Sequence, residues 1–308
     1  LEIERDDQPL PVHPLERNAE RIGQAMLEAA VQARAGHMPA NPPPQPVPQN
    51  RLLLRHRLHL LHRAEALGAD GVATGHYARI ERDGARRLRL LRGMDPARDQ
   101  TAVLWMLTPE TLGRVRFPVG GLSKPEVRDE ARRRALPVAE KPDSQEICFV
   151  PDGDWRAFLR NHGVVSAPGP VVDMAGRVVG THDGVPFYTV GQRRGLPAMP
   201  GAAPKYVTAI DAARNTLTIG GADDGFASGC LGEGVNWIRP AAAGQPVRAE
   251  VKVRYRQVPT SAFVTALGGG RARVVFDQPQ RAVTPGQPSV FYDGDEVLGG
   301  GVIAESVQ

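Results

Sequence analysis

The sequence predicts an α/β fold, with a Rossmann-like first domain, a small central domain of α+β or all-β type and a C-terminal β-barrel. Three observations predict this order. Residues 71–76 are an apolar run that ends in a glycine turn, and residues 125–134 have a clear helical pattern. After residue 148 the helical periodicity fades. Residues 166–308 are rich in Gly, Val and Thr, with strand-like runs about eight to ten residues apart.

Length and composition agree with several folded domains. The chain has 308 residues, of which 41% are hydrophobic and 23% are charged, as in ordinary globular proteins. We place the first domain at residues 1–156, the central domain at 157–222 and the barrel at 223–308. The sequence contains no apolar run long enough to span a membrane, no charged-then-apolar leader, and only two cysteines. We therefore expect a cytoplasmic protein with no disulfide framework and no membrane partner.

Arginine carries most of the positive charge. The net charge is +4, and only four of the 38 basic residues are lysine. Guanidinium groups suit contacts with phosphates and nucleobases, so this composition is compatible with RNA binding. A GC-rich genome, which favours Arg, Ala, Pro and Gly codons, explains the same bias. Charge alone therefore does not select a function.

The N-terminal part combines two helical patterns with a proline-rich loop. Residues 19–31 have the spacing of an amphipathic helix. Residues 41–50 contain five prolines, which exclude a helix or an interior strand. Residues 51–67 place leucines on one helical face and are rich in arginine and histidine. This basic helix faces either RNA or solvent.

Residues 71–76 predict a short buried strand that ends at Gly75. Ligands of α/β sheets bind at this carboxyl edge, where a glycine lets the backbone approach a nucleotide closely. An ordinary strand-to-loop turn would use the same glycine. Residues 79–91 then alternate between polar and apolar types, which predicts a hairpin.

Two further helices are predicted in this domain. Residues 99–101 open a helix that contains Trp105 and Leu107. Residues 125–134 form the second helix, with Ser123 as its N-terminal cap.

The remaining sequence predicts antiparallel β-structure. Residues 171–179 read as a hairpin that turns at Gly176, and residues 206–219 as a second hairpin with Asn215 near its turn. Clear strands of the closing barrel lie at 247–255, 271–277 and 289–292.

Cys148 lies where a polar loop enters a short apolar run, in the segment Lys-Pro-Asp-Ser-Gln-Glu-Ile-Cys-Phe at 141–149. Reactive cysteines favour such edges, because a thiolate needs partial exposure and a nearby positive charge or amide donors. A small buried hydrophobic residue would fit the same position.

The segment around Cys148 resembles the persulfide-bearing loop of the tRNA-specific 2-thiouridylase (MnmA/TrmU) family. The resemblance extends over roughly residues 64–305. Its other motifs, in family order, lie at 73–79, 98–101, 117–120, 122–128, 182–184, 188–196, 254–255 and 284–287. It implies a Rossmann-like nucleotide-binding domain, here truncated, followed by the two smaller domains.

The resemblance also implies an activity and a set of site residues. Family members activate the C2 oxygen of the wobble uridine with ATP and replace it with sulfur from a cysteine persulfide. It therefore implies tRNA as substrate, ATP with Mg as its counter-ion, a cysteine desulfurase or sulfur-relay protein as sulfur donor, and no metal site in the protein. Cys148 would carry the persulfide, and Gly75 would approach ATP. The residues that would contact tRNA are His76, Arg98, Asp99, Gln100, Arg254, Tyr255 and Gln287. Each also has a structural alternative, such as Asp99 capping the helix that follows.

Three features depart from the family pattern. The Ser-Gly-Gly-Val-Asp-Ser loop, whose amides hold the pyrophosphate of ATP, has no counterpart in these residues. The target-base loop retains Asn41, Pro42 and Pro43, but the second catalytic cysteine expected after it is missing, since no cysteine precedes Cys148. The match is poor over residues 41–62 and then resumes, which suggests an incomplete chain or a reading-frame disturbance.

Three functions are compatible with these observations. The leading hypothesis is ATP-dependent sulfur transfer to tRNA. The second is a catalytically inactive tRNA-binding remnant of the same family. The third is an unrelated α/β hydrolase that uses Cys148, although the sequence offers no Gly-Ser-Gly elbow or paired histidine. Cys230 is expected to be a structural thiol in all three.

Overall fold

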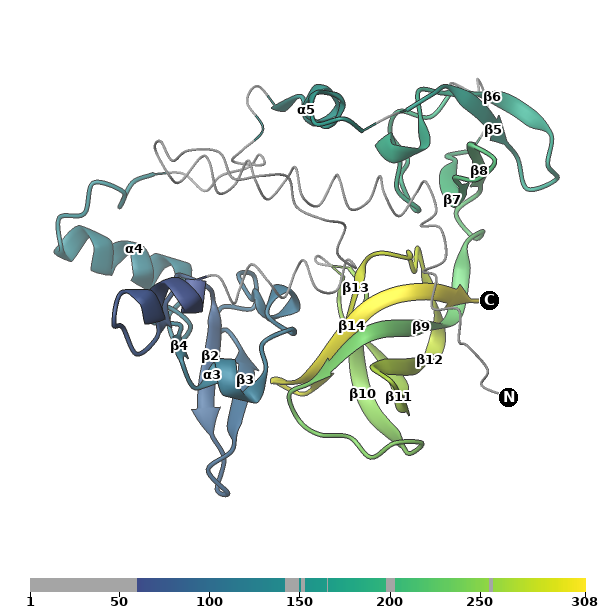
Figure 1. Ribbon diagram of the computed structural model, residues 1–308. Coiled ribbons are helices and arrows are strands. Elements are labelled where there is room, and N and C mark those ends of the chain that lie inside the picture. Colours follow the sequence, from purple (N-terminus) through teal and green to yellow (C-terminus); the bar gives the residue numbers. More distant parts are fainter. Residues whose placement is uncertain (1–59, 142–149, 151–152, 165, 198–202, 255–256) are drawn as a thin grey trace, which may run out of the picture. The chain divides into compact units, whose positions relative to one another are not determined.

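The computed structural model describes residues 60–141, 150, 153–164, 166–197, 203–254 and 257–308 (Figure 1). The chain divides into two compact units. The described parts of one lie within residues 150–222, and those of the other within residues 60–141 and 223–308. The helix predicted at 19–31 and the loop predicted at 41–50 fall outside the described residues.

A two-stranded parallel sheet opens the second unit. In it, β1 (Val72–Ala73) pairs with β4 (Val115–Arg116). Position 71 requires glycine, because a Cβ there would lie 2.2 Å from the carbonyl oxygen of Arg114. The strand predicted at 71–76 exists, but the prediction that it is buried is wrong. β1 is half-buried to exposed, since among the described residues only one strand pairs with it.

The prediction of a helix that contains Trp105 and Leu107 is wrong. Only a single 3-10 turn forms, η1 (Thr101–Val103). Pro109 has no N–H to donate to the carbonyl of Trp105, so the helical hydrogen bond cannot form there. The side-chain amide of Asn236 instead donates to the carbonyls of Trp105 and Leu107, at 2.8 and 3.0 Å. A nearby proline and a residue far away in the sequence therefore act together on the local structure.

Two helices follow, α3 (Pro109–Leu112) and α4 (Lys124–Arg133). α4 confirms the helix predicted at 125–134. The carboxylate of Glu126 accepts hydrogen bonds from the backbone N–H and the hydroxyl of Ser123, each at 2.7 Å. Ser123 is thus the N-terminal cap, as predicted.

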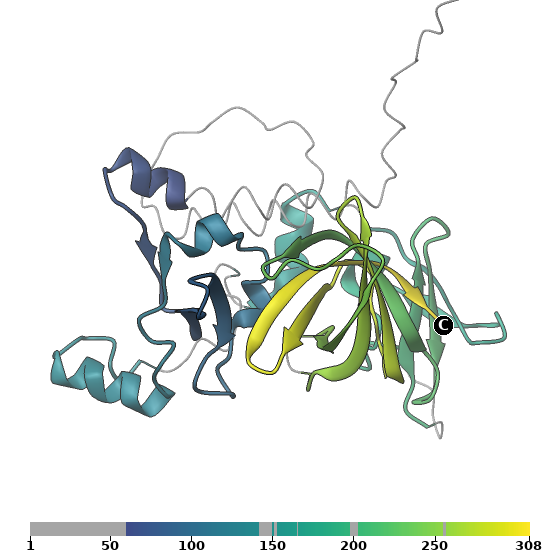
Figure 2. The same ribbon diagram turned by 90° about the horizontal axis from the view of Figure 1, so that it is seen from below.

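The C-terminal part is a closed antiparallel β-barrel, which confirms the predicted architecture (Figure 2). Its strands are β9 (Phe226–Trp237), β10 (Pro246–Lys252), β11 (Thr260–Gly268), β12 (Arg271–Arg281), β13 (Pro288–Asp293) and β14 (Glu296–Val307). Closure follows because β13 pairs with both β10 and β14. Alternation along β11 shows how the core forms: Ala262 and Val264 are buried, whereas Phe263 between them is exposed.

The predicted hairpin at 79–91 forms from β2 (Ala78–Arg82) and β3 (Leu88–Arg92), and it is attached to the barrel. β3 pairs with β14 at Leu91 and Glu296. One buried apolar cluster includes residues of both parts: Ala78, Leu90, Trp105, Val290 and Tyr292. The hairpin and the barrel therefore share a core.

The first unit contains α5 (Trp155–Asn161) and a four-stranded sheet of order β6-β5-β8-β7. Its other elements are β5 (Gly169–Val172), β6 (Val178–His182), η3 (Val185–Phe187), β7 (Tyr206–Asp211) and β8 (Thr216–Gly220). Both predicted hairpins, at 171–179 and 206–219, are confirmed. Gly176 and Asn215 occupy left-handed turn positions, with φ of 78° and 50°.

His182 is a buried structural residue of this unit. Its Nδ1 accepts a hydrogen bond from the N–H of Gly184 at 2.9 Å, so the ring proton lies on Nε2. Nε2 can then donate to the carbonyl oxygen of Asn215, also at 2.9 Å. The ring thereby links the end of β6 to the turn before β8.

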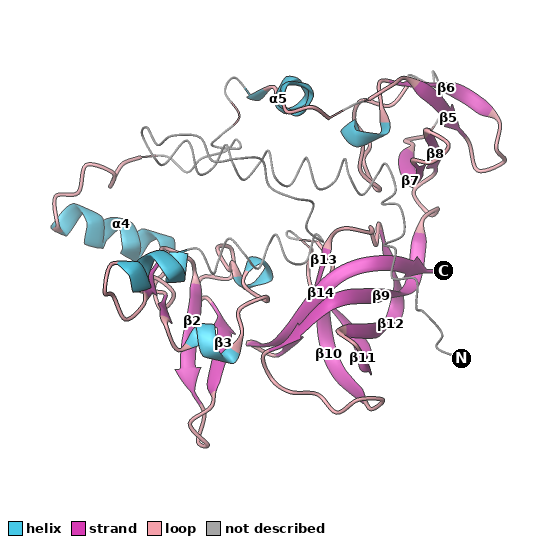
Figure 3. Cartoon of the chain, viewed as in Figure 1, coloured by secondary structure: helices cyan, strands magenta, loops and turns pink. Residues whose placement is uncertain are grey.

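Strands clearly outnumber helices in the described parts (Figure 3). None of the described helices is long and apolar enough to cross a membrane.

Candidate nucleic-acid interface

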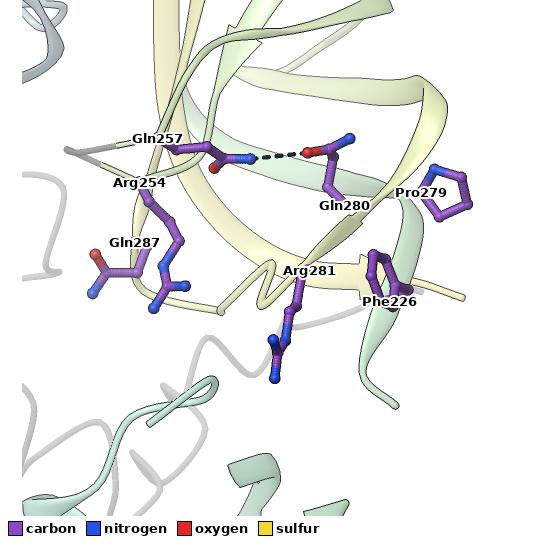
Figure 4. Close-up of a pocket in the computed structure, with 7 residues that line it drawn as sticks. All are labelled: Phe226, Arg254, Gln257, Pro279, Gln280, Arg281 and Gln287. Atoms are coloured by element: carbon purple, nitrogen blue, oxygen red, sulfur yellow. Dashed lines mark hydrogen bonds between the residues drawn. The ribbon is translucent and has the colours of Figure 1, made fainter. Parts of the chain in front are cut away.

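An open groove of about 750 Å³ lies at one end of the β-barrel (Figure 4). Its lining comes from the start of β9, the loop after β10, the end of β12 and the residue before β13. The lining residues are Phe226, Arg254, Gln257, Pro279, Gln280, Arg281 and Gln287. They supply two guanidinium groups, three side-chain amides and no carboxylate. The groove is therefore positively charged and rich in hydrogen-bonding groups.

An irregularity in β12 shapes this end of the barrel. Val275 pairs with Gly229, but the next paired residue of β12, Gln280, lies opposite Ala227, so β12 has extra residues between the two pairs. Pro279 lies in this stretch and has no N–H for a ladder hydrogen bond, which is why prolines in sheets occur at bulges and edges. Bulges bend a strand and redirect its side chains, often beside functional sites.

A chain of side-chain hydrogen bonds fixes the amides of the groove. The Nε2 of Gln257 donates to the Oε1 of Gln280 at 2.9 Å (Figure 4). The Nε2 of Gln280 in turn donates to the hydroxyl of Thr260 and the carbonyl of Gln278, at 3.1 and 2.8 Å. This chain leaves the Oε1 of Gln257 as a buried acceptor with no hydrogen-bond partner among the described residues.

Arg254 and Gln287, both predicted to contact tRNA, line this one groove although they are far apart in the sequence. The carbonyl of Arg254 accepts from the N–H of Gln257 at 3.2 Å, which fixes its backbone after β10. The backbone of Gln287 is held on both sides, since its N–H donates to Thr284 and its carbonyl accepts from Ile303. Both side chains are exposed at the end of these fixed backbones.

Asp99 and Gln100 do not line the groove, and their side chains bond within the protein. The Oδ1 of Asp99 accepts from the N–H and the hydroxyl of Thr101, at 3.1 and 2.8 Å. The Oε1 of Gln100 accepts from the N–H of Tyr77 at 3.0 Å. Asp99 thus holds the start of η1, much as the capping alternative anticipated. Arg98 is exposed beside them, and contact of these three residues with tRNA stays a prediction.

A second cavity, of about 290 Å³ and mostly apolar, lies beside His76. Its lining is Leu60, Leu61, Val72, Thr74, His76, Leu104, Met106, Leu107, Thr108, Thr111, Val115 and Phe117. The hydroxyl of Thr74 and the Nδ1 of His76 are 2.8 Å apart, and the imidazole meets the ring of Phe117 edge-on. Gly75 is exposed, with no atom within 4 Å of the place a Cβ would take.

The described lining of this cavity does not fit the triphosphate of ATP. It includes no lysine or arginine, and an anion site needs such cations or a set of converging backbone amides. The residues present suit an apolar or aromatic ring. ATP contact at Gly75 therefore stays a prediction, and no chemical step is derived from it.

Cys230 is a structural thiol, as predicted. Its side chain is fully buried in the apolar core of the barrel. Burial raises the pKa of the thiol to about 11 from an ordinary value of 9.0, against a smaller opposing effect of the nearby Ser289 hydroxyl. A buried, protonated thiol is a poor nucleophile.

Several predicted site residues fall outside the described residues. These are Cys148, Tyr255 and the target-base loop at 41–43. Within the described part of the chain, no group of three or more His, Cys, Asp or Glu side chains could hold a metal ion.

Sequence reasoning missed most of the groove, namely Phe226, Gln257, Pro279, Gln280 and Arg281. One signal was available. The run Asp-Gln-Pro-Gln-Arg at 277–281 interrupts an alternating strand with polar residues and a proline, which is typical of a bulge.

Three family models match the chain in succession. The tRNA methyl transferase HUP domain matches residues 43–152, the tRNA methyl transferase PRC-barrel domain matches 156–221, and the aminomethyltransferase β-barrel domain matches 227–303. The chain therefore belongs to the class of proteins in which a HUP domain is followed by a PRC-barrel domain and a C-terminal β-barrel domain.

Similar proteins narrow this class. A tRNA-specific 2-thiouridylase MnmA of Geobacter metallireducens is 51% identical over 245 residues, which are 79% of this chain and 66% of the relative. Those of Heliobacterium modesticaldum and Chloroflexus aggregans are 49% and 47% identical, covering 80% and 85% of this chain and 65% and 72% of the relatives. The chain belongs to the tRNA-specific 2-thiouridylase MnmA family. It spans about two thirds of the length of these relatives.

Proposed function

We propose that this chain takes part in 2-thiolation of the wobble uridine of tRNA, as a tRNA-uridine 2-sulfurtransferase that consumes ATP. The names of the relatives support the activity. We also propose the division into a nucleotide-binding domain at 1–156, a central domain at 157–222 and a barrel domain at 223–308.

The observation that carries the proposal is the groove at the end of the barrel. Arg254 and Gln287 were selected from motifs in different segments, and both line the same carboxylate-free groove. Arginine binds phosphates through paired N–H groups, and amide side chains form hydrogen bonds with bases. The groove therefore offers what an RNA substrate needs for positioning.

In this proposal Cys148 carries the sulfur as a persulfide, loaded by a cysteine desulfurase or a sulfur-relay protein. Persulfide sulfur suits the reaction because a thiolate that attacks the inner sulfur forms a disulfide and releases the outer sulfur as a nucleophile. Cys230 is unsuited to that attack, since its thiol is buried and protonated at neutral pH.

A second candidate function is a catalytically inactive, tRNA-binding member of the family. The observation that favours it is the absence of a phosphate-binding loop of the family type, and of a second cysteine before Cys148, in the residues given. The two candidates share the groove and differ only in turnover.

A tRNA thiolation assay separates them. The purified polypeptide is incubated with unmodified tRNA, cysteine, a cysteine desulfurase and Mg-ATP, and 2-thiouridine is measured by mass spectrometry. ATP-dependent product that Cys148→Ser abolishes supports the transferase. Tight tRNA binding without product supports the inactive binder, and neither binding nor product would refute both.

A further inference from the structure

The groove has an aromatic residue that the tRNA-contact motifs do not include. Phe226 begins β9 and pairs across the sheet with Arg281, the last residue of β12. Phe226 is 40% exposed, so part of its surface is accessible to a ligand in the groove that it lines. Phe226 and Pro279 lie on one side of the groove, with Arg254, Gln257 and Gln287 on the other (Figure 4).

We propose that this groove is a subsite for one unpaired nucleotide of RNA, with the base stacked on Phe226 and hydrogen-bonded to Gln257. The inference rests on the proposed function, because it specifies how the barrel holds the RNA. Base stacking on aromatic side chains is the usual way in which proteins bind unpaired nucleotides.

Gln257 supplies a directed acceptor for that nucleotide. Its amide cannot rotate without losing the hydrogen bond from its Nε2 to Gln280, and Gln280 is itself held by two acceptors. The Oε1 that remains is buried and has no partner among the described residues. A buried acceptor without a donor is unfavourable, so a ligand N–H placed there would remove that cost. Every nucleobase has an N–H on its pairing edge.

Arg254 and Arg281 complete the subsite. Arg254 lies after β10 and Arg281 ends β12, and Figure 4 shows both guanidinium groups pointing towards the same side. Two separated cations suit the phosphates on either side of a single nucleotide.

Paired RNA does not fit this arrangement. A base in a duplex has both faces covered by its neighbours, and its pairing edge is already hydrogen-bonded. It can offer neither a face to Phe226 nor an N–H to Gln257. The subsite therefore selects unpaired nucleotides, whereas arginine contacts alone would bind either form.

The test compares binding of a fluorescent single-stranded RNA octamer with binding of a blunt RNA duplex, by anisotropy at fixed salt. Phe226→Leu keeps an apolar side chain but removes the ring, and it should weaken binding of the single strand about tenfold or more. Duplex binding should stay within about twofold, because phosphate contacts remain. Gln257→Leu should also weaken the single strand selectively.

Two variants serve as controls. Phe263 is another exposed ring of the barrel, but it lies outside the groove. Phe263→Leu should therefore change the affinity for neither the single strand nor the duplex. Phe226→Tyr keeps the ring and should retain wild-type affinity even if the leucine variant is less stable. Circular dichroism of each variant checks folding.

An unchanged single-strand affinity in Phe226→Leu, or an equal loss for both RNAs, would overturn the subsite. In either case Arg254→Ala still reports on the proposed function. Loss of tRNA binding in Arg254→Ala with no effect of Phe226→Leu would retain the RNA interface and reject the stacked nucleotide. Absence of tRNA binding by the wild-type chain would reject the proposed function itself.

Discussion

Cys230 should remain unmodified while Cys148 becomes persulfidated, and the burial of Cys230 sets how much slower it reacts than an ordinary thiol. At pH 8 a thiol with the ordinary pKa of 9.0 is about one-tenth thiolate, whereas one with a pKa of about 11 is about one-thousandth thiolate. Loading needs a thiolate, so the smaller thiolate population slows Cys230 about a hundredfold, but its more basic thiolate is about tenfold more nucleophilic. The net effect of the pKa is a reaction about tenfold slower than that of an ordinary thiol. Full burial adds a steric barrier, because a donor enzyme can reach the sulfur only after the barrel opens.

The assay is mass spectrometry of tryptic peptides after incubation with a cysteine desulfurase and cysteine, followed by alkylation. We expect the persulfide on the Cys148 peptide, no label in Cys148→Ser, and undiminished label in Cys230→Ser. Thiolated tRNA should form with little or no turnover, because no second thiol is available to take up the inner sulfur. Label on Cys230 alone, or many turnovers per chain, would refute this reasoning.

Four other predictions follow from the structure. Arg254→Ala should lower the slope of log K against log salt for tRNA binding by about 0.7 to 0.9, whereas Arg271→Ala, at the opposite end of β12, should not; equal slopes would remove Arg254 from the interface. Calorimetry of a polypeptide of these 308 residues should detect no tight ATP binding, and a micromolar constant would contradict this. Gly120→Ala should unfold at a lower temperature than the wild type, because its Cβ would lie 1.7 Å from a backbone oxygen, a clash that costs about 1–3 kcal/mol or more. Gly75→Ala, where a Cβ meets no atom, should unfold like the wild type. Equal unfolding midpoints for the two variants would contradict the geometry. Because burial raises the pKa of Cys230 from 9.0 to about 11, its contribution to the free energy of unfolding is full below pH 9.0 and decreases towards pH 11. In Cys230→Ala the pH dependence of the free energy of unfolding, measured by urea unfolding, should be shallower over this range by about one proton.

The sequence predicted features whose causes are local. The turns at Gly176 and Asn215, the cap at Ser123 and the hairpin at 79–91 depend on neighbouring residues, and all four form as expected. The closed barrel was also predictable, because alternating strands with frequent turns leave few other architectures.

Features that depend on distant residues were not predicted. Pro109 already opposes the helix expected around Trp105, but the hydrogen bonds that Asn236 of β9 donates to the carbonyls of Trp105 and Leu107 could not be read from the sequence. The groove could not be predicted for the same reason, because Phe226 and Gln257 come to line one groove only when the barrel closes. Asp99 is of the right type to bind RNA, but its hydrogen bonds within the protein cannot be read from its type.

The pairing of β3 with β14 has a consequence for synthesis on the ribosome. Leu91 is made 205 residues (296 − 91) before its partner Glu296. At roughly 5–20 residues per second, the apolar face of the hairpin waits roughly 10–40 s for the strands that cover it. During this interval the described part of the first unit, within residues 150–222, is synthesised as well. We therefore expect nascent chains of this protein to engage chaperones that shield apolar strands until β14 is made.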